Sequence, residues 1–188
     1  GVRKIRVTGG EPLIRRGVDE LFAGLGELPG LETLALTTNG SQLAKQATHL
    51  RDAGVSSVNI SLDSLNPSRF HAITRIGHLD AVIKGIEAAI TVGLKRIRLN
   101  AVILNGVNRD ETLSLTRFAI DKNIHIAFIE EMPLGQVNVG GKALAYVSSD
   151  DIKAELEQHF ELQALSSQAD AGPSRDFRIA GTRTEVGF

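Results

Sequence analysis

Residues 4–12 read KIRVTGGEP, and this stretch predicts the first strand of a sheet and the loop that follows it. It begins with basic and β-branched residues in alternation, which is typical of a strand, and continues into two glycines, a glutamate and a proline. The glycines let the backbone approach a ligand closely, and Pro12 stiffens the exit from the turn. We expect a strand followed by a ligand-binding loop whose Glu11 carboxylate could hold an ammonium group. The plainer alternative is an ordinary turn.

Further strands are expected at intervals along the chain, in apolar β-branched runs at 33–36, 58–62, 97–104 and 126–129. Amphipathic helices are expected between them, over 18–25 and 79–90, from apolar residues at helical spacing. An alternation of strands and helices in steps of about 30 residues indicates α/β architecture with a parallel sheet. A complete eight-unit barrel needs about 250 residues, so an open sheet or a partial barrel fits better.

The ends of the expected helices carry ordinary signals. Gly54 and Gly93 each follow a helical stretch, as a left-handed glycine would, and Asn66-Pro67 starts another helix. After residue 134 the pattern becomes irregular, and then residues 148–151 (SSDD) open a helix. The sequence therefore predicts a partial barrel over 1–134 and a C-terminal extension over 135–188 made of a linker, a helix and strands.

The composition excludes several classes of protein. The 188 residues are 42% hydrophobic and 23% charged, with a formal net charge of -1, which is ordinary for a globular domain. That balance excludes a polybasic nucleic-acid tail, and no apolar run is long enough to span a membrane. The chain has no cysteine, so as written it supplies neither a thiol nucleophile nor thiolate ligands for an iron–sulfur cluster.

Cations lie on single faces of two expected strands. Side chains alternate between faces of a strand, so Lys4, Arg6 and Thr8 share one face, while Arg98 shares another with Asn100. A buried parallel strand is normally apolar on both faces. These faces indicate either a solvated edge strand or an interior that binds an anion such as a phosphate.

The remaining strand ends carry polar motifs with plainer alternatives. Residues 37–40 (TTNG) could be a simple turn, and residues 61–64 (SLDS) could merely cap a helix through Asp63, Ser64 or Asn66. Residues 130–133 (EEMP) contain paired carboxylates, which fit either acid–base groups or a solvated loop. The five histidines show no metal-ligand spacing with one another.

Taken together, these motifs resemble the radical S-adenosylmethionine superfamily, and within it the GTP 3′,8-cyclase family, whose reaction starts molybdenum cofactor biosynthesis. The resemblance rests on strings that occur in order along the chain: KIRVTGGEP (4–12), LTTNG (36–40), DAG (52–54), NISLDS (59–64), FHAIT (70–74), RLNAV (98–102), GVN (106–108) and FIEEM (128–132).

This resemblance implies a fold and a set of binding residues. The fold would be an incomplete parallel (βα)6 barrel of the radical SAM type that lacks its first βα unit. S-adenosylmethionine would be bound by Gly10, Ser61 and Met132, and GTP by Arg6, Thr37 and Arg98. No catalytic residue or metal ligand is assigned.

The resemblance also implies a lyase reaction that needs two [4Fe-4S] clusters. S-adenosylmethionine would be cleaved to a radical that abstracts the ribose 3′ hydrogen of GTP, and the ribose carbon would then close onto C8 of guanine. A downstream pterin synthase would take the product in the cytoplasm, without nucleic acid or membrane, and a homodimer is compatible with the family.

Two departures from the family pattern qualify the expectation. The family's cysteine motifs are missing, so we expect a core truncated at both ends that is inactive by itself. Ala127 stands where many relatives have arginine, which removes one expected GTP contact. The alternatives are another radical SAM enzyme, one that modifies a peptide or assembles a cofactor, and a cysteine-free nucleotide-binding module.

Overall fold

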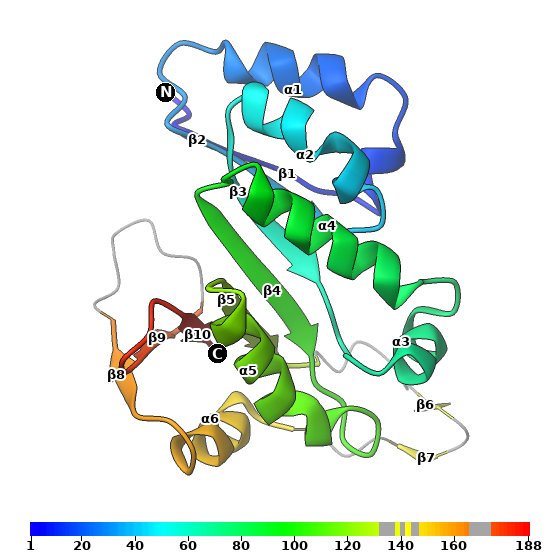
Figure 1. Ribbon diagram of the computed structural model, residues 1–188, viewed down its shortest axis with the longest axis vertical. Helices are drawn as coiled ribbons and strands as arrows, with labels where there is room; N and C mark the ends of the chain where they lie inside the picture. Colours follow the sequence, from blue (N-terminus) through cyan, green and yellow to red (C-terminus); the bar gives the residue numbers. More distant parts are fainter. Residues whose placement is uncertain (132–137, 140–141, 144–146, 166–173) are drawn as a thin grey trace. The chain divides into compact units, whose positions relative to one another are not determined.

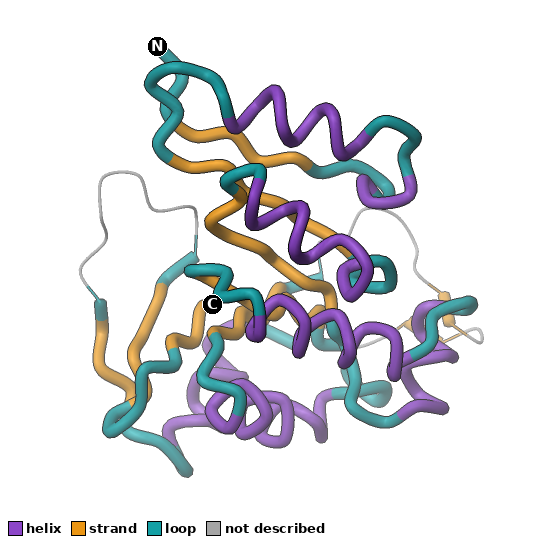
Figure 2. The backbone as a smooth tube through the Cα atoms, turned by 45° about the horizontal axis from the view of Figure 1, so that its top comes forward, coloured by secondary structure: helices purple, strands orange, loops and turns teal. Residues whose placement is uncertain are grey.

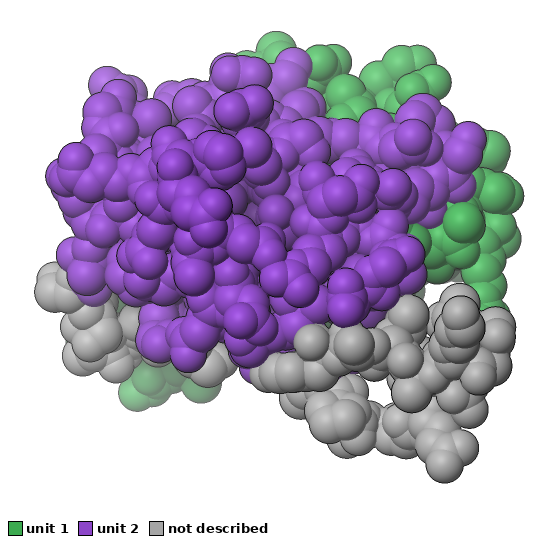
Figure 3. All heavy atoms as spheres, turned by 90° about the horizontal axis from the view of Figure 1, so that it is seen from below, with its two compact units in different colours: residues 1–62, 70–99 green, residues 63–69, 100–188 purple. Residues whose placement is uncertain are grey.

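A computed structural model describes residues 1–131, 138–139, 142–143, 147–165 and 174–188. The chain divides into two compact units. Unit 1 contains residues 1–62 and 70–99, and unit 2 contains residues 63–69 and 100–188 (Figure 3). The predicted boundary between residues 134 and 135 lies outside the described residues.

Unit 1 is built from repeated strand–helix steps. Its strands are β1 (Lys4–Val7), β2 (Thr33–Thr38), β3 (Val55–Ser61) and the first residues of β4 (Arg96–Val102), in the order β1-β2-β3-β4. β1 pairs parallel with β2, and β2 pairs parallel with β3. The connections contain a short 3-10 helix η1 (Pro12–Ile14) and the helices α1 (Val18–Gly26), α2 (Leu43–Asp52) and α4 (Leu79–Thr91) (Figure 1).

One face of these strands forms the core of unit 1. Leu36, Val58 and Ile60 are completely buried there, and α1, α2 and α4 lie along the same side of the strands (Figures 1 and 2). Burying an aliphatic side chain stabilises the fold by about 1.5–3 kcal/mol, so the alternation of the strands fixes which face the helices cover. Arg6, Thr37 and Asn59 alternate with these core positions and are therefore directed to the opposite face, whereas Thr38 is buried on the core side.

Most of unit 2 lies after β4 along the chain. It contains the short 3-10 helix η2 (Arg109–Glu111), α5 (Thr112–Asp121), β5 (His125–Ile129), α6 (Ser149–Glu157), β8 (Leu162–Ala164), β9 (Asp176–Ile179) and β10 (Glu185–Gly187). The remaining helix, α3 (Pro67–Thr74), spans the boundary of the two units, and β6 (Asn138–Val139) pairs antiparallel with β7 (Lys142–Ala143).

The order of the strands continues as β4-β5-β10-β9-β8. β10 pairs parallel with β5, whereas β9 and β8 are antiparallel to their neighbours. The order ends at β1 and at β8, so the described strands form an open, mostly parallel sheet rather than a closed barrel. The predicted α/β class and incomplete barrel are confirmed. No helix in the described ranges is long and apolar enough to cross a membrane.

Most local predictions are confirmed, with differences at strand ends. Gly54 and Gly93 have φ of +85° and +77°, and Asn66 Oδ1 accepts a hydrogen bond from the Arg69 amide at the start of α3. β3 begins three residues earlier than predicted, and β4 ends at Val102 instead of Leu104. The reason for the early end is that the Leu104 amide donates to the Asn108 side chain, at 2.8 Å, and leaves the strand ladder.

Candidate functional site

Arg6, Thr37 and Arg98 come together on the polar face of unit 1. Arg6 on β1 lies opposite Ala35 on β2, and its Nη1 donates to Thr37 Oγ1 and to the Leu36 carbonyl, both at 3.4 Å. Arg98 on β4 is close enough to Arg6 for their charges to interact. We call these three residues the cationic face. The structure thus brings together the three residues predicted to bind GTP.

The electrostatics of the cationic face favour an anion. Partial burial, and then the positive charge of Arg98, lower the pKa of Arg6. Arg6 forms no ion pair with a carboxylate in the described part of the chain. The Arg6 guanidinium, beside the Thr37 hydroxyl and within the positive field of Arg98, therefore lies where a phosphate would be favoured and would accept its hydrogen bonds.

The loop after β1 is held in place by Glu11. One carboxylate oxygen accepts from the Leu13 amide at 2.9 Å and from Thr38 Oγ1 at 2.8 Å, and the other accepts from the Asn39 amide at 2.6 Å. Glu11 therefore ties the loop after β1 to the loop after β2. These bonds favour a structural role for this carboxylate over the ammonium-binding role considered from sequence.

Close packing also fixes the loop after β2. Gly40 has φ of +79°, and a Cβ there would lie 2.9 Å from Ile60 Cγ2 and 3.0 Å from Val82 Cγ1. Only glycine satisfies both the left-handed backbone and this approach. The Asn39 side chain accepts from the Ser41 amide at 2.9 Å, which confirms the turn predicted at TTNG. Thr37 is therefore presented from a rigid strand end.

The residues predicted to bind S-adenosylmethionine occupy the ends of two parallel strands. Gly10 follows β1 and is exposed, and a Cβ at Gly10 would meet no heavy atom within 4 Å, so its backbone is open to a ligand. Ser61 is the last residue of β3 and is also exposed. Within the described chain no hydrogen bond joins Gly10 to Ser61. Met132 lies outside the described residues.

Unit 2 holds a buried polar cluster at the loops that follow β3 and β4, which we call the loop clamp: Asp63, Ser64, Asn108 and Glu111. Asp63 Oδ1 accepts from the Val102 amide at 2.8 Å, and the fully buried Asn108 donates to the carbonyls of Asp63 and Val102 at 2.7 and 2.9 Å. Burial raises the pKa of Asp63, and the hydrogen bond from Val102 opposes that shift.

Glu111 completes the loop clamp. Its carboxylate accepts from Ser64 Oγ and from the Leu65 amide, both at 2.7 Å, and pairs with Arg69 at 2.5 Å. Asp63 was a candidate helix cap from sequence, and that alternative is wrong because the carboxylate bonds to Val102 while Asn66 caps α3. Sequence reasoning missed the Asn108 and Glu111 contacts.

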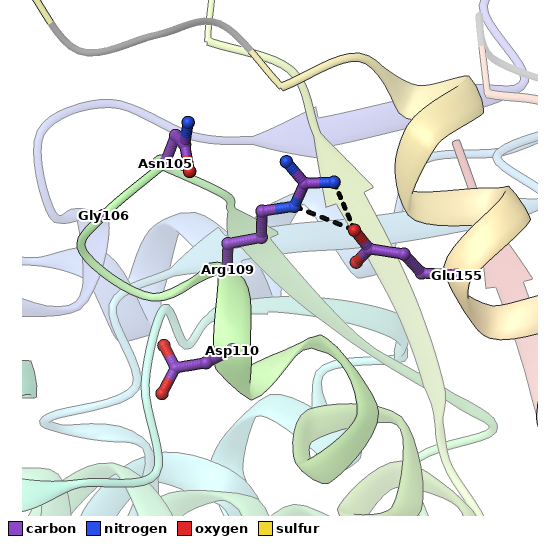
Figure 4. Close-up of a pocket in the computed structure, with 5 residues that line it drawn as sticks. All are labelled: Asn105, Gly106, Arg109, Asp110 and Glu155. Atoms are coloured by element: carbon purple, nitrogen blue, oxygen red, sulfur yellow. Dashed lines mark hydrogen bonds and ion pairs between the residues drawn. The ribbon is translucent and has the colours of Figure 1, made fainter.

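A separate pocket of about 400 Å³ lies in unit 2 and is lined by Asn105, Gly106, Arg109, Asp110 and Glu155. Arg109 points from η2 toward Glu155 on α6 and pairs with its carboxylate (Figure 4). None of these residues belongs to the predicted binding set, and the internal ion pair satisfies the central cation. This pocket is therefore not the site that the motifs predict.

Glu130 directly follows β5 and Ala127 lies within β5, and both have contacts of a structural kind. Glu130 accepts a hydrogen bond from the Ser149 amide at the start of α6, which favours a capping role over acid–base chemistry. Ala127 is buried in β5 opposite Gly187 of β10. The described residues contain no group of three or more metal-ligating side chains, and the whole sequence contains no cysteine.

Comparison with curated proteins finds relatives that share one name. The chain is 52% identical over 189 residues to "GTP 3',8-cyclase" of Pseudomonas entomophila (strain L48) and 50% identical over 188 residues to "GTP 3',8-cyclase" of Ectopseudomonas mendocina (strain ymp). Both comparisons cover 100% of this chain and 56% of the relative. The chain thus spans little more than half the length of these relatives.

Solved structures with the same fold are far more distant in sequence. Streptococcus suis SuiB bound to precursor peptide SuiA matches with a TM-score of 0.65 at 20% identity, over 85% of this chain and 36% of SuiB. Coproporphyrinogen III oxidase (HemN) from Escherichia coli matches with a TM-score of 0.61 at 12% identity, over 95% of this chain and 52% of HemN. These likenesses support the fold alone. The family model of the radical SAM superfamily matches residues 1–119, and the chain belongs to this superfamily.

Proposed function

We propose that this chain is the core of a GTP 3′,8-cyclase, which uses S-adenosylmethionine to convert GTP to 3′,8-cyclo-7,8-dihydro-GTP in the first step of molybdenum cofactor biosynthesis. The observation that carries the proposal is the cationic face, where Arg6, Thr37 and Arg98 lie together on the polar face of unit 1. Relatives about half identical along the whole chain bear that name, which supports the same assignment.

Within the cationic face, Arg6 and Arg98 would bind the phosphates of GTP. Arginine suits this task because its planar fork makes parallel hydrogen bonds to phosphate oxygens. Thr37 Oγ1 already accepts from Arg6, so its hydroxyl proton remains free to donate to a phosphate or ribose oxygen. These three side chains orient the nucleotide, and the rigid strands that carry them fix its position.

The residues present fit S-adenosylmethionine. Gly10 offers an open backbone and Ser61 an exposed hydroxyl, both at the carboxyl ends of parallel strands, where ligands bind in this class of sheet. We propose that Met132 joins them. When bound, S-adenosylmethionine supplies the radical chemistry that gives the superfamily its name.

The residues present do not fit an iron–sulfur cluster, because the sequence has no cysteine. We therefore derive no step through a cluster. We propose that the ligands of two [4Fe-4S] clusters lie in the part of the protein that these 188 residues do not cover, since the curated relatives are nearly twice as long.

The test uses the protein encoded by the complete reading frame, purified without oxygen and supplied with iron, sulfide and a reductant. We expect it to consume GTP and S-adenosylmethionine together and to release the cyclised nucleotide. Arg98→Gln is expected to raise the KM for GTP at least tenfold, whereas Arg51→Gln, an exposed arginine paired with Asp52 on α2, leaves it unchanged.

Cleavage of S-adenosylmethionine with no change in GTP would overturn the substrate and favour another radical SAM reaction, such as peptide modification. Binding of GTP without cleavage of S-adenosylmethionine would favour a nucleotide-binding module. The proposal extends to a cytoplasmic enzyme whose product passes to a pterin synthase, and to a homodimer that light scattering of the same preparation would detect.

A further inference from the structure

Asn59 lies beside the cationic face and was assigned no role there. In the parallel pairing of β2 with β3, Asn59 is the register partner of Thr37. Partners in register place their side chains on the same face of a sheet, with the strands about 4.8 Å apart. Thr37 in turn accepts from Arg6 on β1. Three neighbouring strands therefore present a cation, a hydroxyl and a carboxamide in one row.

The amide of Asn59 makes no hydrogen bond to any described residue, although the side chain is half-buried. Three other asparagines of the chain differ in this respect, whereas Asn100, Asn105 and Asn123 resemble Asn59 in the described part of the chain. Asn39, Asn66 and Asn108 each bond to a backbone group of the protein. The oxygen and nitrogen of the Asn59 side chain are not among the buried polar atoms that lack a partner, so the carboxamide reaches solvent and is open to a ligand in this row.

The position and chemistry of Asn59 select the part of a nucleotide that it would meet. The amide is neutral, with one acceptor and two donors, so it matches a hydroxyl better than a phosphate. Asn59 lies on β3, between the strands that carry Thr37 and Arg98, so a nucleotide held by the cationic face comes within reach of its carboxamide. We propose that Asn59 binds a ribose hydroxyl of the GTP substrate and so determines specificity for a ribonucleotide. This inference rests on the proposed function.

The experiment measures the Kd of the full-length protein for four ligands: GTP, 2′-deoxy-GTP, 3′-deoxy-GTP and S-adenosylmethionine. Asn59→Ala is expected to raise the Kd for GTP about fivefold to tenfold, the scale of one hydrogen bond. For the wild type, one of the two deoxy analogues is expected to have a Kd higher than that for GTP by the same factor. For Asn59→Ala, that analogue and GTP are expected to have equal Kd values, because the contact with the missing hydroxyl is already lost. Ser56→Ala on the same strand, whose hydroxyl bonds to the Leu34 carbonyl, is the control and leaves every Kd unchanged.

The outcomes separate this inference from the proposed function. If the deoxy analogues bind more weakly than GTP by the same factor in the wild type and in Asn59→Ala, the ribose contact is refuted. The contact is also refuted if Asn59→Ala loses affinity for S-adenosylmethionine instead of GTP. A wild type that binds and converts GTP while Asn59→Ala behaves identically overturns the inference alone. A wild type that does not bind GTP overturns both. Should Asn59→Ala fold poorly, equal affinity of the wild type for GTP and both deoxy analogues still refutes the contact.

Discussion

The cationic face of unit 1 and the loop clamp of unit 2 use polar residues in opposite ways. In the loop clamp, Asn108 and Glu111 are buried and bonded to backbone or side-chain partners within the protein. On the cationic face, Arg6 makes two long hydrogen bonds to the residues that the structure describes, and it lies near a second arginine. Polar groups that satisfy one another stabilise a fold, whereas like charges held together cost stability and favour a bound anion.

Asn108 is the centre of the loop clamp, and its removal is expected to cost the most stability. Asn108→Ala deletes bonds to Asp63, Val102 and Leu104 and leaves buried backbone groups unsatisfied. We expect the free energy of unfolding to fall by about 3 kcal/mol. Urea denaturation followed by circular dichroism measures it.

The matched control for that prediction comes from the other region. Asn59→Ala removes an amide without a partner in the described chain, so we expect a change below about 0.5 kcal/mol. Equal losses in the two asparagine variants would show that the contrast between the regions is wrong.

Substitution of Glu111 tests whether the stability of the loop clamp depends on the charge of this carboxylate. Glu111→Gln keeps the size of the side chain but replaces one acceptor oxygen by a donor that faces the Ser64 hydroxyl or the Leu65 amide. We expect the free energy of unfolding to fall by about 2 kcal/mol, measured by the same denaturation. Asp110→Asn, which alters an exposed carboxylate paired with the same Arg69, should change it by less than about 0.5 kcal/mol, and an equal effect would contradict the role of burial.

The two regions also differ in how well sequence predicts them. Strand alternation alone predicts the polar faces that carry Arg6 and Arg98, because it is visible within a few residues, whereas their assignment to GTP rests on the family resemblance. The loop clamp joins residues far apart in the chain: Asp63 bonds to Val102 39 positions away, and Ser64 bonds to Glu111 47 positions away. No local pattern encodes such a contact, so only the folded chain reveals it.

Distant contacts also explain where the loops differ from the expectations based on sequence. Glu11 was visible as part of GGEP, but its partners Thr38 and Asn39 lie 27 and 28 positions away, and the carboxylate was open to a ligand-binding interpretation. β4 was predicted to continue to Leu104 because its apolar run does, yet Asn108 takes the Leu104 amide. The apolar pattern predicts which segments become strands, and distant polar partners decide where they end.

Substitution of Arg6 tests whether the cationic face serves ligand binding and not stability. Arg6→Gln removes one of two neighbouring charges, so we expect the Kd for GTP of the full-length protein to rise about 10- to 30-fold. The midpoint of thermal unfolding should not fall, because repulsion with Arg98 is relieved. Calorimetric titration and a melting curve measure the two quantities, and a variant that melts earlier with unchanged GTP affinity would assign Arg6 to stability instead.

The smallest expected effect concerns the protonation of Asp63. Burial raises its pKa in the folded state, so the folded protein holds this proton more tightly than the unfolded chain, whose aspartates titrate near about 4. The stability that the protonated Asp63 side chain contributes to the fold is therefore fully present below about pH 4, and it is lost as the pH rises through the folded-state pKa. Asp63→Asn keeps an oxygen that can accept from Val102 but no longer titrates. The free energy of unfolding of Asp63→Asn, compared with that of the wild type, should thus increase from pH 4 to pH 7, as measured by urea denaturation at each pH. The control is Asp121→Asn at an exposed site, for which no such trend is expected. A difference that is constant across this range would mean that the carboxylate gains as much from the Val102 hydrogen bond as it loses by leaving water.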